Sequence, residues 1–365
     1  MQLEFFPSRA LTFYLARLFI TRIVAVLLML VLVLQVLDLL GESGDILAHP
    51  GNGEAQLFYY VTLRIPQLIA RFLPYSVLLA TIITLATLNQ NSEVISMKAA
   101  GLSAHQILAP LMLTAVVVAL LSFAFNERVV TRASAALEAW ESVDYGPIPK
   151  DSGVRSNIYL SDGKDLMLAQ TLEGSGNAMV LNGVTFYRRS EQGMIVEQLR
   201  AARATYVNPG WKLEQPVRFD VSGTKTTRLA SATVAQGITP EEVTMARVDA
   251  DSQNIVELAH SIGALRDAGR RTSELEAAWW HKISGPLSST LMPLLGAVAA
   301  FGLARSGQLL IRAVIGMALG FAYFVVDNAA LAMGNFGGYP PLVAAWAPFF
   351  LFALIGETVL IRTEE

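Results

Sequence analysis

The sequence predicts a membrane α-helical protein with six transmembrane helices and an inserted extracytoplasmic all-β domain that is jelly-roll-like. Three observations predict this fold class. Hydrophobic residues make up 53% of the 365 residues and charged residues only 16%, whereas about a quarter of the residues in a soluble domain are charged. Six apolar runs are long enough to cross a bilayer. Between the third and fourth runs lie seven or eight short β-type segments.

The apolar runs define the expected membrane spans. These spans are 18–40, about 57–88, about 105–126, 282–304, 309–333 and 340–361. The first run is expected to be retained as a span, because a signal peptide has a shorter apolar core followed by a cleavage site of small residues. Trp279 and Trp280 precede the fourth run and fit an aromatic belt at the boundary between water and lipid.

Turn signals divide the region after the third span into strands. Asp162-Gly163 predicts a hairpin, Asn208-Pro209-Gly210 predicts a turn, and Asn182-Gly183 predicts a second turn or a bulge. Strands at this spacing are typical of a sandwich or jelly roll, here of about 95 residues. The expected domains are 1–145 with the first three spans, 146–250 as the β-domain, 251–281 as an amphipathic linker helix, and 282–365 with the last three spans.

The linker helix is expected to begin at Ser252 as its N-cap and to end near Gly269. Its apolar residues recur at helical spacing, so that one face can be buried. They are Ile255, Leu258, Ala259, Ile262 and Leu265.

The distribution of Lys and Arg predicts the orientation. The short loops at 41–56 and 334–340 contain neither residue, whereas both termini and the 89–104 segment are basic or carry a lysine. The positive-inside rule therefore places both termini and 89–104 in the cytoplasm and the β-domain outside. The chain has no cysteine, which excludes disulfides, thiolate metal sites and a cysteine nucleophile.

Residues 89–104 form a partly polar segment between two apolar runs. Ser92 is a plausible N-cap and Gly101 a plausible C-terminal stop for a short helix. On that helix, Glu93, Ser96, Met97 and Ala100 share one face, which suits docking into a groove on a cytoplasmic partner. An ordinary loop between two helices is the alternative interpretation.

Ionisable residues within the spans mark candidate substrate contacts, because a charge in a membrane is costly and usually faces a protein interior or a cavity. The four arginines of this kind form two same-face pairs, and together they predict an outward-facing basic lining for carboxylate or phosphate groups. Pairing with nearby acidic residues or with lipid headgroups is an equally open alternative. The arginines are Arg64, Arg71, Arg128 and Arg132, and the nearby acids are Asp38, Glu42 and Glu127.

Two further features of the fifth span are weaker signals. Asp327 is interpreted either as a proton-relay carboxylate or, more commonly for a lone acid, as a polar contact between helices. Gly316 and Gly320 form a G-x-x-x-G pattern that permits close helix packing, within this chain or against another subunit.

The sequence contains no pattern for catalysis or for cofactor binding. The four histidines are not spaced as metal ligands, and neither a phosphate-binding G-x-x-x-x-G-K-[ST] loop nor a G-x-S-x-G element occurs. We therefore expect no catalytic residues, no metal site and no cofactor in this chain, so that any ATP is bound by another chain. The absence of a basic block argues against a nucleic-acid partner.

Several motifs resemble the LptF/LptG (YjgP/YjgQ) permease family, and the resemblance covers essentially the whole chain. The most specific pieces are Ser92 to Gly101, which reads S-E-x-x-x-M-x-A-x-G, then Asn126-Glu127-Arg128-Val129, and Tyr339-Pro340-Pro341. The last two pieces and the first span are more similar to the LptG branch than to the LptF branch.

This resemblance implies a permease subunit of the ATP-driven lipopolysaccharide exporter in the bacterial inner membrane. One LptF and one LptG would pair with an LptB ATPase dimer that binds ATP and Mg. The coupling helix at about 90–103 would be seated on LptB through Glu93, Ser96, Met97, Lys98, Ala100 and Gly101. Spans one and five would admit lipopolysaccharide from the outer leaflet and pass it to the β-domain, then to LptC and the periplasmic LptA bridge.

One departure from the family pattern affects the substrate site. The resemblance implies a basic outer end of the first span, whereas this chain carries Gln35, Asp38 and Glu42 there. Either Arg64 and Arg71 supply part of the missing positive charge, or the native lipid carries fewer negative groups. The alternative function, from a different class, is a membrane sensor or mechanotransmission protein whose β-domain binds an extracytoplasmic ligand.

Overall fold

The computed structural model describes most of the chain as two compact units. It describes residues 6–364 except 142–143, 147–154, 163–164, 174–178, 191–193, 222–224, 241–242, 244–248, 268–270 and 302–308. One unit comprises 1–44, 54–135 and 250–365, and the other comprises 45–53 and 136–249. The four-domain division expected from the sequence stays a prediction, and each compact unit is described by itself.

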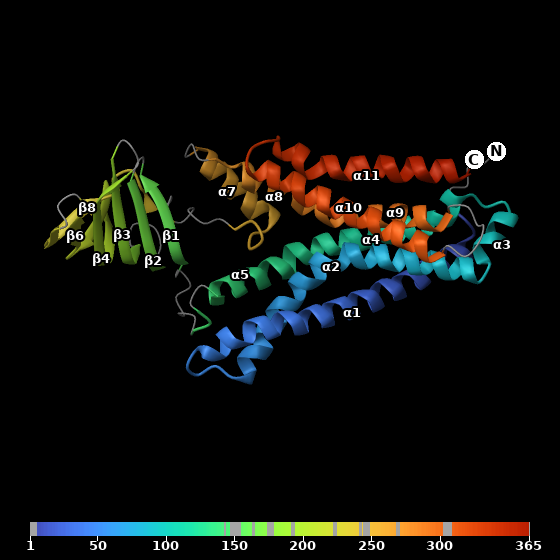
Figure 1. Cartoon of the computed structure of the whole chain (residues 1–365), viewed down its shortest axis with the longest axis horizontal. Helices are drawn as coiled ribbons and strands as arrows, with labels where there is room; N and C mark the ends of the chain where they lie inside the picture. The colour runs from blue at the N-terminus through green and yellow to red at the C-terminus, as the bar shows by residue number, and fades with distance from the viewer. Residues whose placement is uncertain are drawn as a thin grey trace. The chain divides into compact units, whose positions relative to one another are not determined.

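Long apolar helices build the first unit (Figure 1). In chain order the helical elements are α1 Arg9–Ala48, α2 Glu54–Gln90, α3 Glu93–Ala99, α4 Ala104–Phe125, the π-helical turn η1 Asn126–Val130, α5 Thr131–Glu141, α7 Ile255–Asp267, α8 Ser273–Leu287, the 3₁₀ turn η3 Ser288–Thr290, α9 Leu291–Phe301, α10 Leu309–Asn335 and α11 Pro341–Glu364. Among the described residues, five helical stretches are long and apolar enough to cross a membrane, namely 9–48, 54–90, 104–141, 314–335 and 341–362.

These stretches coincide with five of the six expected spans. The expected span 282–304 is not one unbroken helix, because α8 gives way to the turn η3 before α9 begins. Pro286 lacks a backbone donor, and the hydroxyl groups of Ser288 and Thr290 donate to main-chain carbonyls three residues earlier. Both effects compete with regular helical hydrogen bonding. The structure therefore supports several membrane-capable helices, and the total of six spans stays a prediction.

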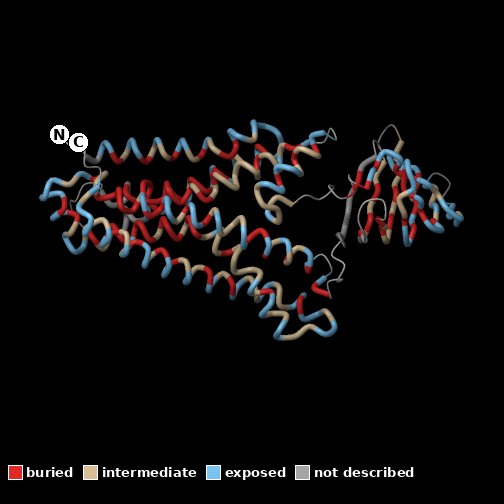
Figure 2. The backbone as a smooth tube through the Cα atoms, turned by 180° about the vertical axis from the view of Figure 1, so that it is seen from behind, coloured by how far each residue is buried: buried red, intermediate tan, exposed pale blue. Residues whose placement is uncertain are grey.

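The buried core of the helical unit lies around α2, α4 and α9, while α1 and α11 lie at its periphery (Figures 1 and 2). In its most apolar window α1 is only 22% buried, compared with 56% for α2. Leu15, Phe19 and Ile23 are the residues of α1 that enter the central core. Most of the remaining α1 surface is apolar and exposed, as expected for a helix in contact with lipid.

The second unit contains an antiparallel sheet. Its strands are β1 Arg155–Asp162, β2 Asp165–Glu173, β3 Val180–Arg189, β4 Ile195–Val207, β5 Gly210–Glu214, β6 Val217–Asp220, β7 Lys225–Arg228 and β8 Ser231–Val234. The strand order is β1-β2-β3-β4-β5-β8, and β6 pairs with both β4 and β7. Trp211 is fully buried in the core of this unit, and its indole Nε1 donates to the Ile238 carbonyl at 2.9 Å. An inserted antiparallel β region is thus confirmed, while jelly-roll topology stays a prediction.

Two of the three predicted turns are confirmed. The β1–β2 hairpin closes with Asp162 opposite Asp165, although Gly163 lies outside the described residues. The turn at Asn208 and Pro209 joins β4 to β5, with Val207 opposite Gly210.

The predicted turn or bulge at Asn182-Gly183 is wrong. Strand β3 continues through both residues, and its register with β2 and β4 is unchanged across them, although Gly183 has φ +61°. The register irregularity lies instead between Arg188 and Arg189. Pairing with a strand on each side outweighs the local turn preference, since a turn would break both ladders.

Helix α7 confirms the predicted amphipathic helix, with Leu258, Ile262 and Leu265 buried. Its N-cap is Asn254, however, and not Ser252. The Asn254 side chain accepts hydrogen bonds from the backbone N–H groups of Val256 and Glu257, and the Glu257 carboxylate accepts the Asn254 N–H at 3.1 Å. This reciprocal pair is a capping box, in which the acid three residues after the cap decides where the helix begins. The predicted end at Gly269 lies outside the described residues.

Candidate functional site

The first candidate site is the short helix α3, which follows α2 directly. The chain enters it through Ser92 in the left-handed conformation (φ 61°), and the Ser92 side chain makes no capping hydrogen bond. Ser92 is nevertheless confirmed as the N-cap residue, because its backbone carbonyl accepts the first helical hydrogen bond, from the Ser96 N–H, and α3 begins at the next residue. The predicted stop is confirmed, because Gly101 (φ +87°) donates to Lys98 O and Leu102 donates to Met97 O. This pair of bonds is a Schellman motif, which favours glycine at the left-handed position.

Packing divides the predicted docking residues of α3 into two groups. Met97 lies with Val94 in the core of the helical unit, so its side chain is not on the outward surface. Ser96, Lys98 and Ala100 are exposed. Ile95 does not belong to the face predicted from the helical spacing, yet its side chain is 59% exposed. An exposed large apolar side chain on a polar connecting segment is the signal that identifies it.

Glu93 lies between these two groups. Its carboxylate accepts hydrogen bonds from the Tyr14 hydroxyl at 3.1 and 3.3 Å. The Tyr14 side chain comes from α1, so the acid at the start of α3 contacts a different span from those that flank it. Glu93 is half-buried, and the hydrogen bonds from Tyr14 hold its carboxylate in place.

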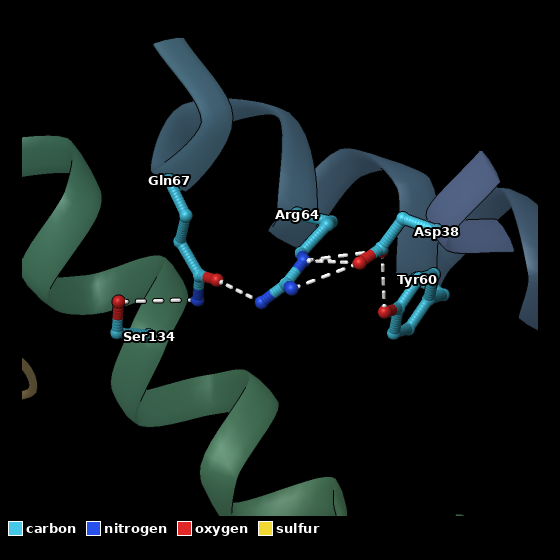
Figure 3. A network of polar contacts seen from close by, with 5 residues as sticks. All are labelled: Asp38, Tyr60, Arg64, Gln67 and Ser134. Carbon is cyan, nitrogen blue, oxygen red and sulfur yellow. Dashed lines mark hydrogen bonds and ion pairs between the residues drawn. The ribbon is translucent and has the colours of Figure 1, made fainter. Parts of the chain in front are cut away.

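A polar network joins α1, α2 and α5 in the helical unit (Figure 3). The Arg64 guanidinium reaches Asp38 through Nε at 3.1 Å to both oxygens and through Nη2 at 2.8 Å. Tyr60 donates its hydroxyl to the same carboxylate at 2.7 Å. Arg64 Nη1 also donates to Gln67 Oε1 at 2.7 Å, and Gln67 Nε2 donates to Ser134 Oγ at 3.1 Å.

The structure brings together only part of the predicted substrate lining. Arg64 pairs with Asp38, which is one of the two alternatives left open by the sequence. Arg71, Arg128 and Arg132 are exposed and form no ion pair with another described residue. Their role as substrate contacts stays a prediction. Tyr60, Gln67 and Ser134 were missed, although the Gln67 position one helical turn after Arg64 was a usable signal.

The π-helical turn η1 positions a further acid, Glu127, whose side chain is 14% exposed. The Glu127 carboxylate accepts the backbone N–H of Ile255, the first residue of α7, at 2.7 Å. Its other oxygen lies 3.9 Å from Lys282 Nζ on α8, and both side chains are largely buried. Negative charge at a helix N-terminus is stabilising, so Glu127 fixes the start of α7 against the third expected span.

The residues of α10 that the sequence marks as candidates for a relay or for helix packing are Asp327, Gly316 and Gly320. Contacts within this chain account for Asp327 and Gly320. Asp327 is buried, and its Oδ2 lies 3.1 Å from Nε2 of His281 on α8. This geometry is that of a polar contact between helices. Gly320 packs against Leu78 of α2 so closely that a Cβ would collide with that side chain. Gly316 is also buried, and the described residues contain no group of three or more His, Cys, Asp and Glu side chains placed to hold a metal ion.

Comparison with known proteins adds the family. Residues 13–362 match the family described as lipopolysaccharide export system permease LptF/LptG. The chain is 26% identical over 365 residues to the lipopolysaccharide export system permease protein LptG of Escherichia coli K12, with 98% of this chain and 99% of that protein covered. It is also 26% identical over 316 residues to LptG of Haemophilus influenzae, covering 85% and 87%. The chain belongs to the LptF/LptG family of lipopolysaccharide export permeases.

Proposed function

We propose that this chain is a transmembrane permease subunit of an ATP-driven lipopolysaccharide exporter, of the LptG type. The observation that carries the proposal is the match to LptG proteins over nearly the full length of both chains. In this role the chain is a transporter component and not an enzyme. It lies in the bacterial inner membrane as a multi-pass protein, with both termini in the cytoplasm and the β unit in the periplasm.

Helix α3 is the proposed contact with the energy source. It connects the second and third expected spans and exposes Ile95, Ser96, Lys98 and Ala100. A small exposed surface with an apolar centre suits insertion into a groove on a cytoplasmic ATPase. An LptB-type ATPase dimer binds ATP and Mg there, and its closure moves α3 and with it the spans on either side.

The exported lipid follows the spans towards the β unit. Lipopolysaccharide leaves the outer leaflet of the inner membrane between this chain and a paralogous LptF-type permease, and LptC and the periplasmic LptA bridge receive it. Arg71, Arg128 and Arg132 present cationic side chains without a described ion-pair partner, which is the chemistry that phosphate groups require.

The contact with the ATPase is tested by co-purification. Glu93→Lys reverses the charge at the start of α3 and is expected to reduce the recovered ATPase at least about tenfold, because a lost charged contact costs roughly 1.5–3 kcal/mol. Glu93→Ala is expected to give an intermediate loss. The measurement is the ratio of ATPase to permease after affinity purification from membranes.

Tyr14→Phe is the matched control, because it removes the hydrogen bond to Glu93 but keeps the carboxylate. It is expected to retain the ATPase. Equal losses from Tyr14→Phe and Glu93→Lys would show that Glu93 acts by holding α3 against α1. Failure of wild-type chain to retain any ATPase would contradict the transporter proposal and favour a receptor role for the β unit.

A further inference from the structure

Helices α7 and α8 lie side by side (Figure 1) and enclose a pocket. Its volume is about 190 Å³, well above the roughly 30 Å³ of one water molecule but below the roughly 300–1,000 Å³ of a pocket for a drug-sized ligand. The pocket therefore suits a small group such as a lipid headgroup. It is lined by Ala259, Ile262 and Arg266 of α7 and by Glu276, Trp279 and Trp280 of α8.

Two indole rings form the aromatic wall of this pocket. The ring centroids of Trp279 and Trp280 are 4.8 Å apart, and the rings are nearly perpendicular. The Trp279 indole Nε1 donates to the Ile255 carbonyl at 3.0 Å, which fixes that ring against α7. Among the described residues, none accepts a hydrogen bond from the Trp280 indole. Trp280 is therefore able to donate to an oxygen of a ligand, while the ring faces attract a cation.

The charged pair in the pocket lining leaves hydrogen-bonding groups on both partners unused. Arg266 Nη2 donates to Glu276 Oε1 at 2.7 Å, and the Thr272 hydroxyl donates to the same oxygen. Within the described part of the chain, nothing donates to Glu276 Oε2, and nothing accepts from Arg266 Nε or Nη1. A ligand is therefore able to place a negative group against Arg266 and a positive group against Glu276 without breaking the pair.

The position of this pocket in the chain indicates contact with the membrane surface. Trp279 and Trp280 directly precede the expected span 282–304, where an aromatic belt meets the lipid headgroups. Val256 of α7 is 61% exposed, as expected for an apolar side chain on an amphipathic helix that lies at the interface. The ligand best placed to reach the pocket is therefore a lipid of the surrounding membrane.

We propose that the pocket between α7 and α8 binds the headgroup of a resident phospholipid that carries both a phosphate and a primary ammonium group. The phosphate lies against Arg266 and accepts from the Trp280 indole, while the ammonium group lies against Glu276 Oε2 and the indole faces. A zwitterion antiparallel to the Arg266–Glu276 pair satisfies both charges, whereas a purely anionic headgroup is repelled by Glu276. The bound lipid adds contacts across α7 and α8. The proposal goes beyond the proposed function, since this lipid is not exported.

Equilibrium binding measures this site directly. The full-length chain with its co-purifying subunits is immobilised in detergent and titrated with tritium-labelled dioctanoyl phosphatidylethanolamine. The unlabelled competitors are phosphatidylethanolamine, phosphatidylcholine, phosphatidylglycerol, O-phosphoethanolamine and bisphosphorylated lipid A. The wild-type chain is expected to show a saturable component that phosphatidylethanolamine displaces. Phosphatidylcholine and phosphatidylglycerol are expected to need about tenfold higher concentrations, because neither offers an ammonium N–H to Glu276.

Two single substitutions test the groups assigned to the ammonium. Glu276→Gln is expected to weaken binding of phosphatidylethanolamine about tenfold, because it removes the charge that the ammonium contacts. Trp280→Leu keeps the ion pair and is expected to weaken binding several-fold through loss of the cation–π contact. Glu274→Gln is the matched control, because it removes a charge from the same first turn of α8 outside the pocket lining. It is expected to keep the wild-type affinity.

The exchange of Arg266→Glu with Glu276→Arg separates lipid binding from a structural role of the pair. It restores an ion pair between α7 and α8, so the midpoint of thermal unfolding without lipid is expected to return to the wild-type value. It also places a cation beside the indoles, where the ammonium group binds. The affinity for phosphatidylethanolamine is therefore expected to stay at least about tenfold below wild type.

Wild-type affinity in the exchanged chain or in Trp280→Leu overturns the proposal. Equal displacement by phosphatidylglycerol overturns the assignment of an ammonium group, and equal displacement by O-phosphoethanolamine overturns the assignment to a membrane lipid. Equal displacement by lipid A overturns the assignment to a resident phospholipid. None of these results depends on retention of the ATPase by α3, so failure of this inference is distinguishable from failure of the proposed function.

Discussion

At Gly320, α10 lies so close to α2 that a Cβ would collide with the side chain of Leu78. Gly320→Ala is expected to lower the stability of the chain by about 1–3 kcal/mol, the usual cost of inserting a group into a packed contact. The check is the midpoint of thermal unfolding in detergent, followed by intrinsic tryptophan fluorescence.

Gly263→Ala is the control for this substitution. Gly263 lies in α7 with no atom within 4 Å of the Cβ position, so alanine there is expected to be stabilising by about 0.5–1 kcal/mol through helix propensity. A double-mutant cycle with Leu78→Ala identifies the contact. An equal effect of Gly320→Ala in both backgrounds would mean that Leu78 is not the obstacle.

Short sequence patterns identify residues with a packing or polar role, but they do not identify the residues that these side chains contact. The G-x-x-x-G pattern correctly marks Gly320 as a close packing position, yet nothing in it selects α2 as the partner helix. Arg64 and Asp38 are 26 residues apart, and their pairing depends on how α1 and α2 align. Met97 has the helical spacing of the face predicted to dock on a partner, but tertiary packing places its side chain in the core.

At the scale of elements, α7 and α8 are joined by a charged contact around Glu276. Burial raises the pKa of this carboxyl group, but hydrogen bonds from Thr272 and Arg266 and the charge of Arg266 outweigh it, so the pKa lies below its ordinary value. A group with a lowered pKa in the folded state contributes stability above its ordinary pKa of about 4.3. That contribution is lost as the pH falls through the folded-state pKa.

Glu276→Gln is therefore expected to lower the unfolding temperature at pH 7, with a cost of at most about 1 kcal/mol because Arg266 is mostly exposed. The difference from wild type is expected to shrink below about pH 4.3 and to vanish at lower pH. Thermal unfolding curves between pH 7 and pH 3 check this.

Glu274→Gln is the matched control, because Glu274 lies in the same first turn of α8 but is exposed. A pH-dependent difference of the same size in both variants would attribute the effect to the helix dipole and not to the Thr272–Glu276–Arg266 contact.

Local signals predict an element well where no other element competes for its backbone. The hairpin at Asp162 and the stop at Gly101 are of this kind. The Asn182-Gly183 signal fails because two neighbouring strands hold β3 extended. The Ser252 cap fails because Asn254 and Glu257 form a capping box two residues later, whereas Ser92 is the N-cap residue of α3 but makes no side-chain hydrogen bond there. Hydrophobicity predicts the spans, but not the break between α8 and α9.

At the scale of the whole molecule, orientation across the membrane is predicted by the distribution of Lys and Arg alone. The absence of cysteine makes a direct test possible. Ser96→Cys on α3 and Thr227→Cys on β7 both replace exposed residues. A membrane-impermeant maleimide added to spheroplasts is expected to label Thr227→Cys only, and to label both variants after permeabilisation.

The cysteine-free parent chain is the control and is expected to remain unlabelled. Labelling of Ser96→Cys in intact spheroplasts, with protection of Thr227→Cys, would invert the topology and place α3 out of reach of any cytoplasmic ATPase. The experiment depends only on exposure of the two residues, so it is independent of the arrangement of the two compact units.

Because the third helical stretch contains the π-helical turn η1, the direction in which its later side chains point depends on the number of residues in that turn. A π turn contains one more residue per hydrogen-bonded loop than an α turn. Loss of one residue from 126–130 would restore a regular helix and rotate everything after it by about 100°. Ser134 would then point away from Gln67. A single-residue deletion in this turn is therefore expected to displace every later contact of the helix, whereas a substitution changes only the contacts of one side chain.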